Sequence, residues 1–200
     1  FKFGNKIYSK SSLNYLLGLT LLKQNSKNFI PNTVLEIGGG YGVLGEILKY
    51  SGIKKFKYIN IDLPPLSYVT ENYLKKSYGS KNVSGYLDTR KLKKININNL
   101  KRGSSLCSWQ IEKLRGKIDL FVNFISFQEM EPHVVKNYLL KVLKLNPKYI
   151  LLRNMREGKQ IKKKNKIGVK NPVKFNHYHM FLKKKYELIN MNVVPFGFKT

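Results

Sequence analysis

The chain has 200 residues, of which 42% are hydrophobic and 12% aromatic, a composition that excludes an intrinsically disordered protein and fits one globular domain. Its formal charge of +27 suggests either an anionic partner or a coding bias, since Lys, Asn and Ile are abundant throughout. A single cysteine, Cys107, excludes an internal disulfide, and no apolar run is long enough to span a membrane. We expect a cytoplasmic protein and, because the chain begins with Phe1, a trimmed chain or one piece of a longer protein.

Residues 1–30 are predicted to form an N-terminal helical segment ahead of the main domain, residues 31–200. Leucines and Tyr15 recur between Ser12 and Leu22 in a pattern typical of a helix lying against a sheet. Residues 1–8 are predicted either to fold over a ligand cleft as a lid or to fray, as chain ends commonly do.

A glycine cluster joins the first predicted strand, Thr33–Ile37, to a helix that begins near Val43. The strand is β-branched and apolar apart from Glu36, and the apolar residues after the cluster recur at helical spacing. Glycine tolerates positive φ and has no Cβ, so a ligand can lie almost against the backbone of such a turn. The glycines are Gly38, Gly39, Gly40 and Gly42.

Two cofactor classes bind at a turn of this kind. A dinucleotide fingerprint occurs literally from Gly40 to Gly45, but Glu36 lies two residues before the first glycine, where its charge would repel a pyrophosphate. S-adenosylmethionine carries a sulfonium and an ammonium group and no phosphate. The spacing Glu-x-Gly-x-Gly-x-Gly resembles the first motif of class I S-adenosylmethionine-dependent methyltransferases, while a dinucleotide site and a purely structural turn remain alternatives.

The second predicted strand, Phe56–Asp62, ends in a carboxylate. An acid at this position, 26 residues past Glu36, suits the paired hydrogen bonds to a ribose diol in a nucleoside-binding crevice. The alternative for Asp62 is a helix N-cap, because Pro64 and Pro65 open the next helix.

A third strand is predicted at Ser105–Cys107. Trp109 and Gln110 would then emerge at its carboxyl end, where an aromatic face and an amide suit an adenine ring, although a core tryptophan is the competing interpretation.

Three further strands complete the predicted sheet. Ile118–Ser126 is continuously apolar and therefore central, a helix begins at Pro132, and Lys148–Met155 and Tyr186–Val194 supply further strands. Alternation of strands and helices predicts an α/β fold, a doubly wound, mostly parallel, Rossmann-like sheet of about seven strands with helices on both faces.

Three motifs in order resemble those of the sugar O-methyltransferases of bacterial glycan clusters, over roughly residues 10–155. They begin at Leu35, Ile61 and Asp119, and the last of them runs into Ser126-Phe127-Gln128-Glu129-Met130. This resemblance implies S-adenosylmethionine as cofactor, a small-molecule or glycan acceptor, Asp62 on the ribose, and Gln128 and Glu129 beside the acceptor. We assign the following residues to the cofactor site: Glu36, Gly38, Gly39, Gly40, Gly42, Asp62, Leu63, Ser108, Trp109, Gln110 and Asn123.

Methyl transfer to an alcohol needs a group that removes the hydroxyl proton. Glu129 is our first candidate and His177 the second, with His133 and His179 as alternatives. His177 and His179 are predicted to share one side of an extended segment, but no further ligand accompanies them, so we predict no metal site.

Two other functions compete with this prediction. The charge favours an RNA or DNA methyltransferase, but Ser126-Phe127-Gln128-Glu129 stands where an Asn-Pro-Pro-Tyr-type base-flipping motif would be expected. A non-catalytic nucleotide-binding protein with the same fold is the other. The run Lys162-Lys163-Lys164 is predicted to lie in a loop that either closes over an anionic acceptor or is simply solvated.

Overall fold

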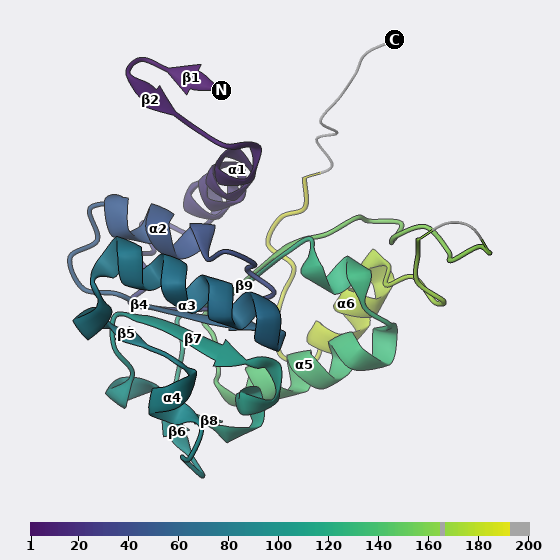
Figure 1. Ribbon diagram of the computed structural model, residues 1–200. Coiled ribbons are helices and arrows are strands. Elements are labelled where there is room, and N and C mark those ends of the chain that lie inside the picture. The colour runs from purple at the N-terminus through teal and green to yellow at the C-terminus, as the bar shows by residue number, and fades with distance from the viewer. Residues whose placement is uncertain (165–166, 193–200) are drawn as a thin grey trace.

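A computed structural model describes residues 1–164 and 167–192 of the chain. Its centre is a parallel six-stranded sheet with the strand order β10-β9-β3-β4-β7-β5. Figure 1 shows this sheet with helices above and below it. The strands are β3 (Thr33–Ile37), β4 (Lys57–Asp62), β5 (Val83–Ser84), β7 (Gly103–Cys107), β9 (Leu120–Phe124) and β10 (Tyr149–Arg153).

Six α-helices and two short strand pairs accompany the sheet in the described residues. The helices are α1 (Lys10–Asn25), α2 (Val43–Tyr50), α3 (Pro64–Tyr78), α4 (Tyr86–Thr89), α5 (Pro132–Lys144) and α6 (Phe175–Leu182). The pairs are β1 (Lys2–Phe3) with β2 (Lys6–Ile7), which are antiparallel, and β6 (Ile95–Asn96) with β8 (Leu114–Arg115), which are parallel. In Figure 1 the β1–β2 ribbon stands away from the sheet, beyond α1.

Strand alternation divides the core between the two faces of the sheet. Val34, Tyr58 and Val122 pack with residues of α1, α2 and α3, whereas Leu35, Ile59 and Phe121 pack with residues of α5 and α6. Because Glu36 follows Val34 by two residues, alternation places its side chain on the face covered by α1, α2 and α3.

The predicted doubly wound parallel fold is confirmed, and so are the helices that open at Pro64 and Pro132. The C-terminal part of the prediction is wrong: residues 186–192 form no strand, and residues 193–200 lie outside the described part of the chain. The main sheet in the described residues therefore has six strands rather than about seven.

The two late histidines lie on a helix, not on an extended segment. Residues two apart on a helix point in different directions, and each ring stacks on another aromatic ring. The His177 ring lies 6.4 Å from that of Phe181, and the His179 ring lies 5.9 Å from that of Phe175. The helix forms there because its buried residue, Tyr178, stacks on Phe127 of the core.

Candidate functional site

The candidate site lies at the carboxyl ends of the parallel strands. On one side of β3 in the sheet lie β4 and then β7. On its other side lie β9 and then β10, which come later in the chain. The strand order therefore reverses between β3 and β9. Ligands of open α/β sheets bind in the crevice at this kind of reversal. The glycine turn follows β3 directly and so lies at this point.

The glycine turn needs glycine for two different reasons. Gly38, Gly40 and Gly42 have φ values of 74°, 57° and 85°, which side-chain-bearing residues rarely adopt. A Cβ on Gly38 would also collide with Ser126, and one on Gly39 would collide with Glu36. A Cβ on Gly40 would meet nothing within 4 Å. Gly40 is therefore the glycine of the turn that borders open space.

The amide groups of the turn are already bound to protein acceptors. Gly38 donates to the carbonyl of Ile61 (2.8 Å), and Gly42 donates to that of Gly39 (3.0 Å). Gly39 donates to the Asn60 side-chain oxygen (3.1 Å), and Gly40 donates to the Asp62 carboxylate (2.9 Å). A dinucleotide-binding turn instead offers such amides to a pyrophosphate.

Glu36 lies beneath the turn and is fully buried. Its two carboxylate oxygens accept hydrogen bonds from the hydroxyls of Tyr15 on α1 (2.6 Å) and Tyr58 on β4 (2.5 Å). Burial raises the pKa of Glu36 to about 7, although the two tyrosine hydrogen bonds lower it; nearby Asp62 raises it further. Glu36 therefore supports the turn from inside the protein, and its carboxylate does not face the open crevice as the sequence interpretation assumed.

Asp62 lies on the other side of the turn. Its second carboxylate oxygen accepts from the amide of Leu63 (2.8 Å), and burial raises its pKa while these two backbone hydrogen bonds lower it. The N-cap residue of α3 is Leu63, so Asp62 is not the cap itself. Its carboxylate is fixed beside Gly40, where a ligand lying over the turn would meet it.

The crevice wall after β7 carries an exposed aromatic pair. Trp109 is 51% exposed, and its ring contacts that of Tyr86 edge to face at 6.3 Å, while Leu63 is 60% exposed. Ser108, half-buried, precedes Trp109. Gln110, which was expected to emerge beside an adenine ring, is fully buried instead. Its side-chain oxygen accepts from the Cys107 amide (2.8 Å), and its side-chain nitrogen donates to the Thr89 hydroxyl (2.9 Å).

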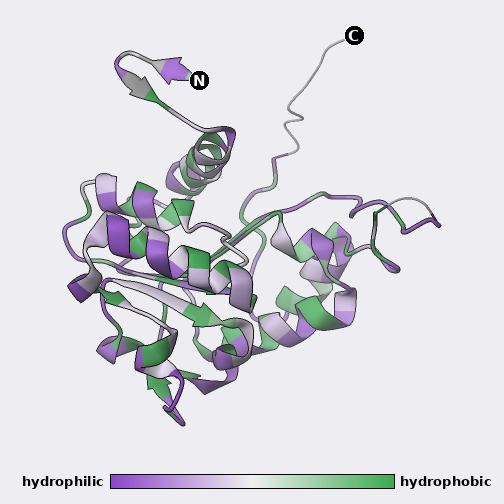
Figure 2. Cartoon of the chain, viewed as in Figure 1, coloured by the Kyte–Doolittle hydropathy of each residue, from purple (hydrophilic) through white to green (hydrophobic). Residues whose placement is uncertain are grey.

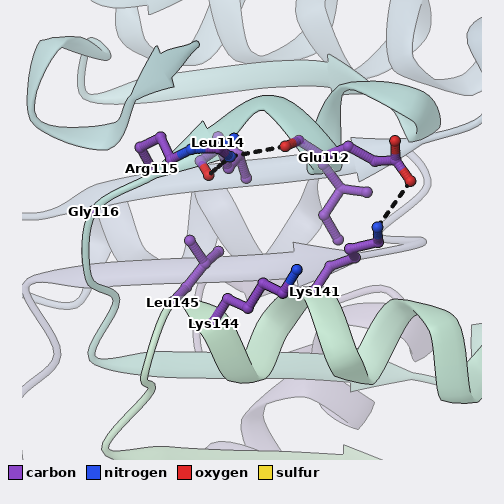
Figure 3. Close-up of a pocket in the computed structure, with 8 residues that line it drawn as sticks. Glu112, Leu114, Arg115, Gly116, Lys141, Lys144 and Leu145 are labelled. Atoms are coloured by element: carbon purple, nitrogen blue, oxygen red, sulfur yellow. Dashed lines mark hydrogen bonds and ion pairs between the residues drawn. The ribbon is translucent and has the colours of Figure 1, made fainter.

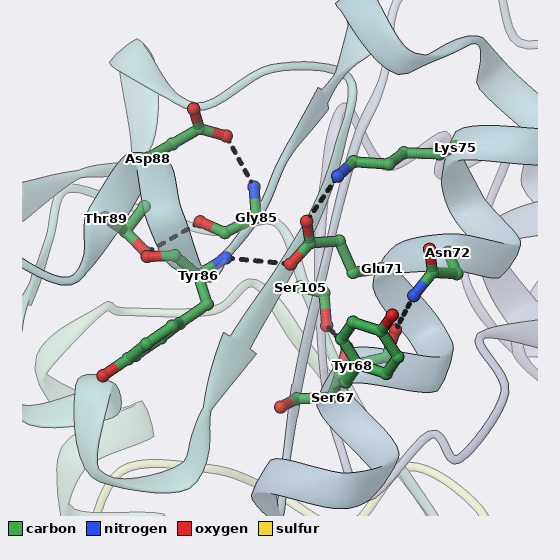
Figure 4. A network of polar contacts seen from close by, with 10 residues as sticks. All are labelled: Ser67, Tyr68, Glu71, Asn72, Lys75, Gly85, Tyr86, Asp88, Thr89 and Ser105. Carbon is green, nitrogen blue, oxygen red and sulfur yellow. Dashed lines mark hydrogen bonds and ion pairs between the residues drawn. The ribbon is translucent and has the colours of Figure 1, made fainter.

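A network around Glu71 holds this wall in place. Glu71 on α3 accepts from the amide of Tyr86 (3.0 Å) and pairs with Lys75 (2.6 Å), and Figure 4 shows that it joins α3 to the segment that begins at Gly85. Asp88 accepts from the amide of Gly85 (2.8 Å), which completes the turn below Tyr86.

Amide side chains fix the carboxyl ends of β9 and β10. Asn123 is fully buried and donates to the carbonyl of Ile37 (2.8 Å), while its oxygen accepts from Phe127 (3.1 Å) and Asn154 (3.0 Å). The Gln128 side chain accepts from the amide of Met155 (2.8 Å). Asn123 thus positions the strand end that precedes the glycine turn.

The candidate proton acceptors are not brought together. Glu129 is exposed at the end of β9 and forms an ion pair with Lys159. His177 accepts from the amide of Lys174 through Nδ1 (2.9 Å) and so caps α6. His133 and His179 are exposed, and the described residues contain no cluster of three or more His, Cys, Asp or Glu side chains suited to a metal.

Sequence reasoning missed the residues that hold the turn from behind. Asn60 bonds Gly39 and also donates to Thr70 (3.0 Å), whose hydroxyl contacts the carbonyl of Gly40. A signal was present in the sequence, because Tyr58, Asn60 and Asp62 place three polar groups on one face of an otherwise apolar strand. No comparable signal marks Tyr15 or Asn154.

Two cavities lie outside the crevice. One of about 340 Å³ lies between Leu114–Gly116 and the end of α5 (Figure 3). It is near the amino end of β9, whereas the glycine turn lies at the carboxyl ends of the strands. The other, of about 590 Å³, follows the free edge of β10 between α1, α6 and residues 185–192, and it reaches Asn154 and Met155. Within the described residues, no helix is both long and apolar enough to cross a membrane.

The chain matches no protein-family model and no curated protein sequence, but solved structures share its fold. A protein described as a putative O-methyltransferase, from Nostoc punctiforme, superposes with a TM-score of 0.56 at 13% identity, over 94% of this chain and 53% of that protein. A SAM-dependent methyltransferase from Aquifex aeolicus superposes with a TM-score of 0.54 at 17% identity, over 88% of this chain and 82% of that protein. Magnesium protoporphyrin IX methyltransferase from Synechocystis, with bound SAH (S-adenosylhomocysteine), superposes with a TM-score of 0.55 at 10% identity, over 90% of this chain and 78% of that protein.

These likenesses define the fold class: the chain has the fold of S-adenosylmethionine-dependent methyltransferases. It spans about half the length of the Nostoc protein.

Proposed function

We propose that the chain is an S-adenosylmethionine-dependent methyltransferase that acts on a hydroxyl of a sugar or glycan precursor. The glycine turn is the observation that best supports S-adenosylmethionine as the cofactor. The backbone amides of its four glycines already donate to protein acceptors, so none of them is left to bind a pyrophosphate; they are Gly38, Gly39, Gly40 and Gly42. The Asp62 carboxylate beside Gly40 makes the surroundings of this turn negative, which favours a nucleoside that carries positive charge, and Glu36 adds charge beneath the turn when it is ionised.

The residues around the turn fit such a nucleoside. Open space over Gly40 admits the ligand close to the backbone, and Asp62 beside it would accept the ribose hydroxyls. Leu63, Ser108 and Trp109 would form the adenine wall, and Asn123 would hold the floor of the site through its bond to Ile37. Gln110 would act from behind, by holding the loop that carries Trp109.

S-adenosylmethionine, when bound, supplies a methyl group on a sulfonium. The acceptor oxygen forms a bond to that carbon as the carbon–sulfur bond breaks, and the hydroxyl proton must leave. We assign the removal of this proton to Glu129, because its side chain is exposed just past β9 and its carboxylate can accept a proton. Its ion pair with Lys159 would have to open or rearrange when the acceptor enters.

The acceptor is proposed to enter from the β10 side. The cavity of about 590 Å³ lies within the size range of small-molecule sites and reaches Met155, whose amide is bound by Gln128. The charge of +27 favours an acceptor with an anionic group. Figure 2 shows hydrophilic residues on all the larger helices rather than on one of them.

Calorimetry with SAH, NAD and a short RNA tests the proposal. We expect binding of SAH and no binding of NAD. Gly40→Ala should weaken SAH binding at least tenfold, because the new Cβ enters the open space over the turn. Gly52→Ala is the matched control: Gly52 also has positive φ (81°) and open space around it, but it follows α2, away from the turn. Binding of NAD but not SAH would refute the cofactor assignment.

Methylation of a panel of sugar nucleotides tests the acceptor. Glu129→Gln should abolish most transfer while leaving SAH affinity within twofold, and Lys159→Met is the control for loss of the ion pair alone. Transfer to RNA and not to any sugar nucleotide would favour the nucleic-acid alternative.

A further inference from the structure

Helix α1 is fastened to the carboxyl end of the sheet by two consecutive residues. The carbonyl of Asn14 accepts from the Arg153 guanidinium on β10 (2.8 Å), and the Tyr15 hydroxyl donates to Glu36 at the end of β3 (2.6 Å). The Tyr15 ring stacks on Phe124 with its centroid at 4.8 Å. Gly18, one turn further on, faces the same ring, and a Cβ there would lie 2.3 Å from Phe124. The helix is therefore built to approach the site closely.

Glu36 connects this helix to the glycine turn. Its other oxygen accepts from Tyr58 and lies 2.4 Å from the position that a Cβ of Gly39 would take. The groups that face the pair come from several elements: Tyr58 and Asp62 from β4, and Tyr78 from α3, which acts on Tyr58. The neighbouring residue of β9 in the sheet register, Val122, is apolar. The ionised carboxylate is thus stabilised chiefly by two hydroxyl groups, one of which belongs to α1.

We propose that Tyr15 and Glu36 form a latch that couples the docking of α1 to occupancy of the glycine turn. The inference rests on the proposed function for its ligand. A ligand that settles on the turn restrains Gly39 and thereby the carboxylate below it, which keeps the Tyr15 bond in place. Tyr15 is a positioning residue, since it acts through Glu36.

Protonation of Glu36 changes the hydrogen bonds of the latch but does not open it. An ionised carboxylate accepts from both tyrosines, whereas a carboxylic acid has one oxygen that carries a proton and must itself donate. One of the two tyrosine bonds then reverses, so that the acid donates to a tyrosine oxygen, and the negative charge beneath the turn is lost. Because burial raises the pKa of Glu36 to about 7, protonation favours the docked state in which this carboxyl is buried, and the latch should hold at pH 6 as well as at pH 8.

Hydrogen exchange of the α1 amides tests the latch without any catalytic assay. In wild type at pH 8, SAH should slow exchange in residues 10–25 at least fivefold, and Tyr15→Phe should abolish this protection while still binding SAH. Tyr58→Phe is the matched control, because it removes an equivalent bond to Glu36 from β4 and not from α1. It should retain the SAH-dependent protection.

An arm without ligand separates this inference from the proposed function. After correction for intrinsic exchange rates, Tyr15→Phe should speed α1 exchange about tenfold at pH 8 and by a similar factor at pH 6. Should wild type fail to bind SAH while this difference between wild type and Tyr15→Phe persists, the methyl-donor assignment fails and the latch stands. Equal α1 exchange in wild type and Tyr15→Phe at pH 8, or unchanged protection by SAH in Tyr15→Phe, would overturn the latch.

Discussion

Replacing Glu36 by glutamine should make the protein more stable at neutral and alkaline pH. A carboxyl group with a pKa of 4.5 when unfolded and about 7 when folded binds more protons in the folded state between these values. Stability should therefore fall as the pH rises through this window and level off above it. The corresponding cost of ionising Glu36 is about 3 kcal/mol, since each pKa unit is worth about 1.4 kcal/mol.

Glutamine removes that cost but does not reproduce both tyrosine bonds. Its amide has one acceptor oxygen, so one of Tyr15 and Tyr58 must accept from the nitrogen instead, and we expect a net gain of about 2 kcal/mol at pH 8. Urea denaturation at pH 5, 6, 7 and 8 measures both the gain and the loss of the pH slope. Glu187→Gln, at an exposed carboxylate, serves as control and should change neither. A Glu36→Gln protein that is less stable than wild type at pH 8 and keeps the same slope would refute this reasoning.

Three further predictions concern packing and ligand contact. Gly18→Val should destabilise the protein by about 1–3 kcal/mol in thermal denaturation, because its Cβ has no room beside Phe124. Asn123→Ala should cost about 2 kcal/mol, because it leaves the buried carbonyl of Ile37 without that donor; Asn190→Ala, at an exposed amide, should be nearly neutral. Trp109 is the only tryptophan and is half exposed, so SAH should change its fluorescence; an unchanged spectrum with saturating SAH would remove it from the adenine wall.

Local chemistry determined those parts of the fold that depend on a few neighbouring residues. The strand Thr33–Ile37 matches the prediction residue for residue, because a short β-branched run followed by glycines has few other conformations. Pro64 and Pro132 begin helices where predicted, since proline lacks the amide that the first helical turn leaves unpaired. The position of Asp62 beside the glycine turn follows in the same way, because neighbouring parallel strands end at the same edge.

Tertiary packing decided what the polar side chains face. Glu36 was readable as a charge beside a turn, but only the docking of α1 shows that Tyr15 covers it and that it supports the turn from within. His177 and His179 could equally have lain on a strand; the stacking of Tyr178 on Phe127 makes the segment helical. Such contacts join residues far apart in the chain, so local sequence by itself determined the strand, the turn and the acids, and the packing of distant elements decided which of those acids meets the crevice.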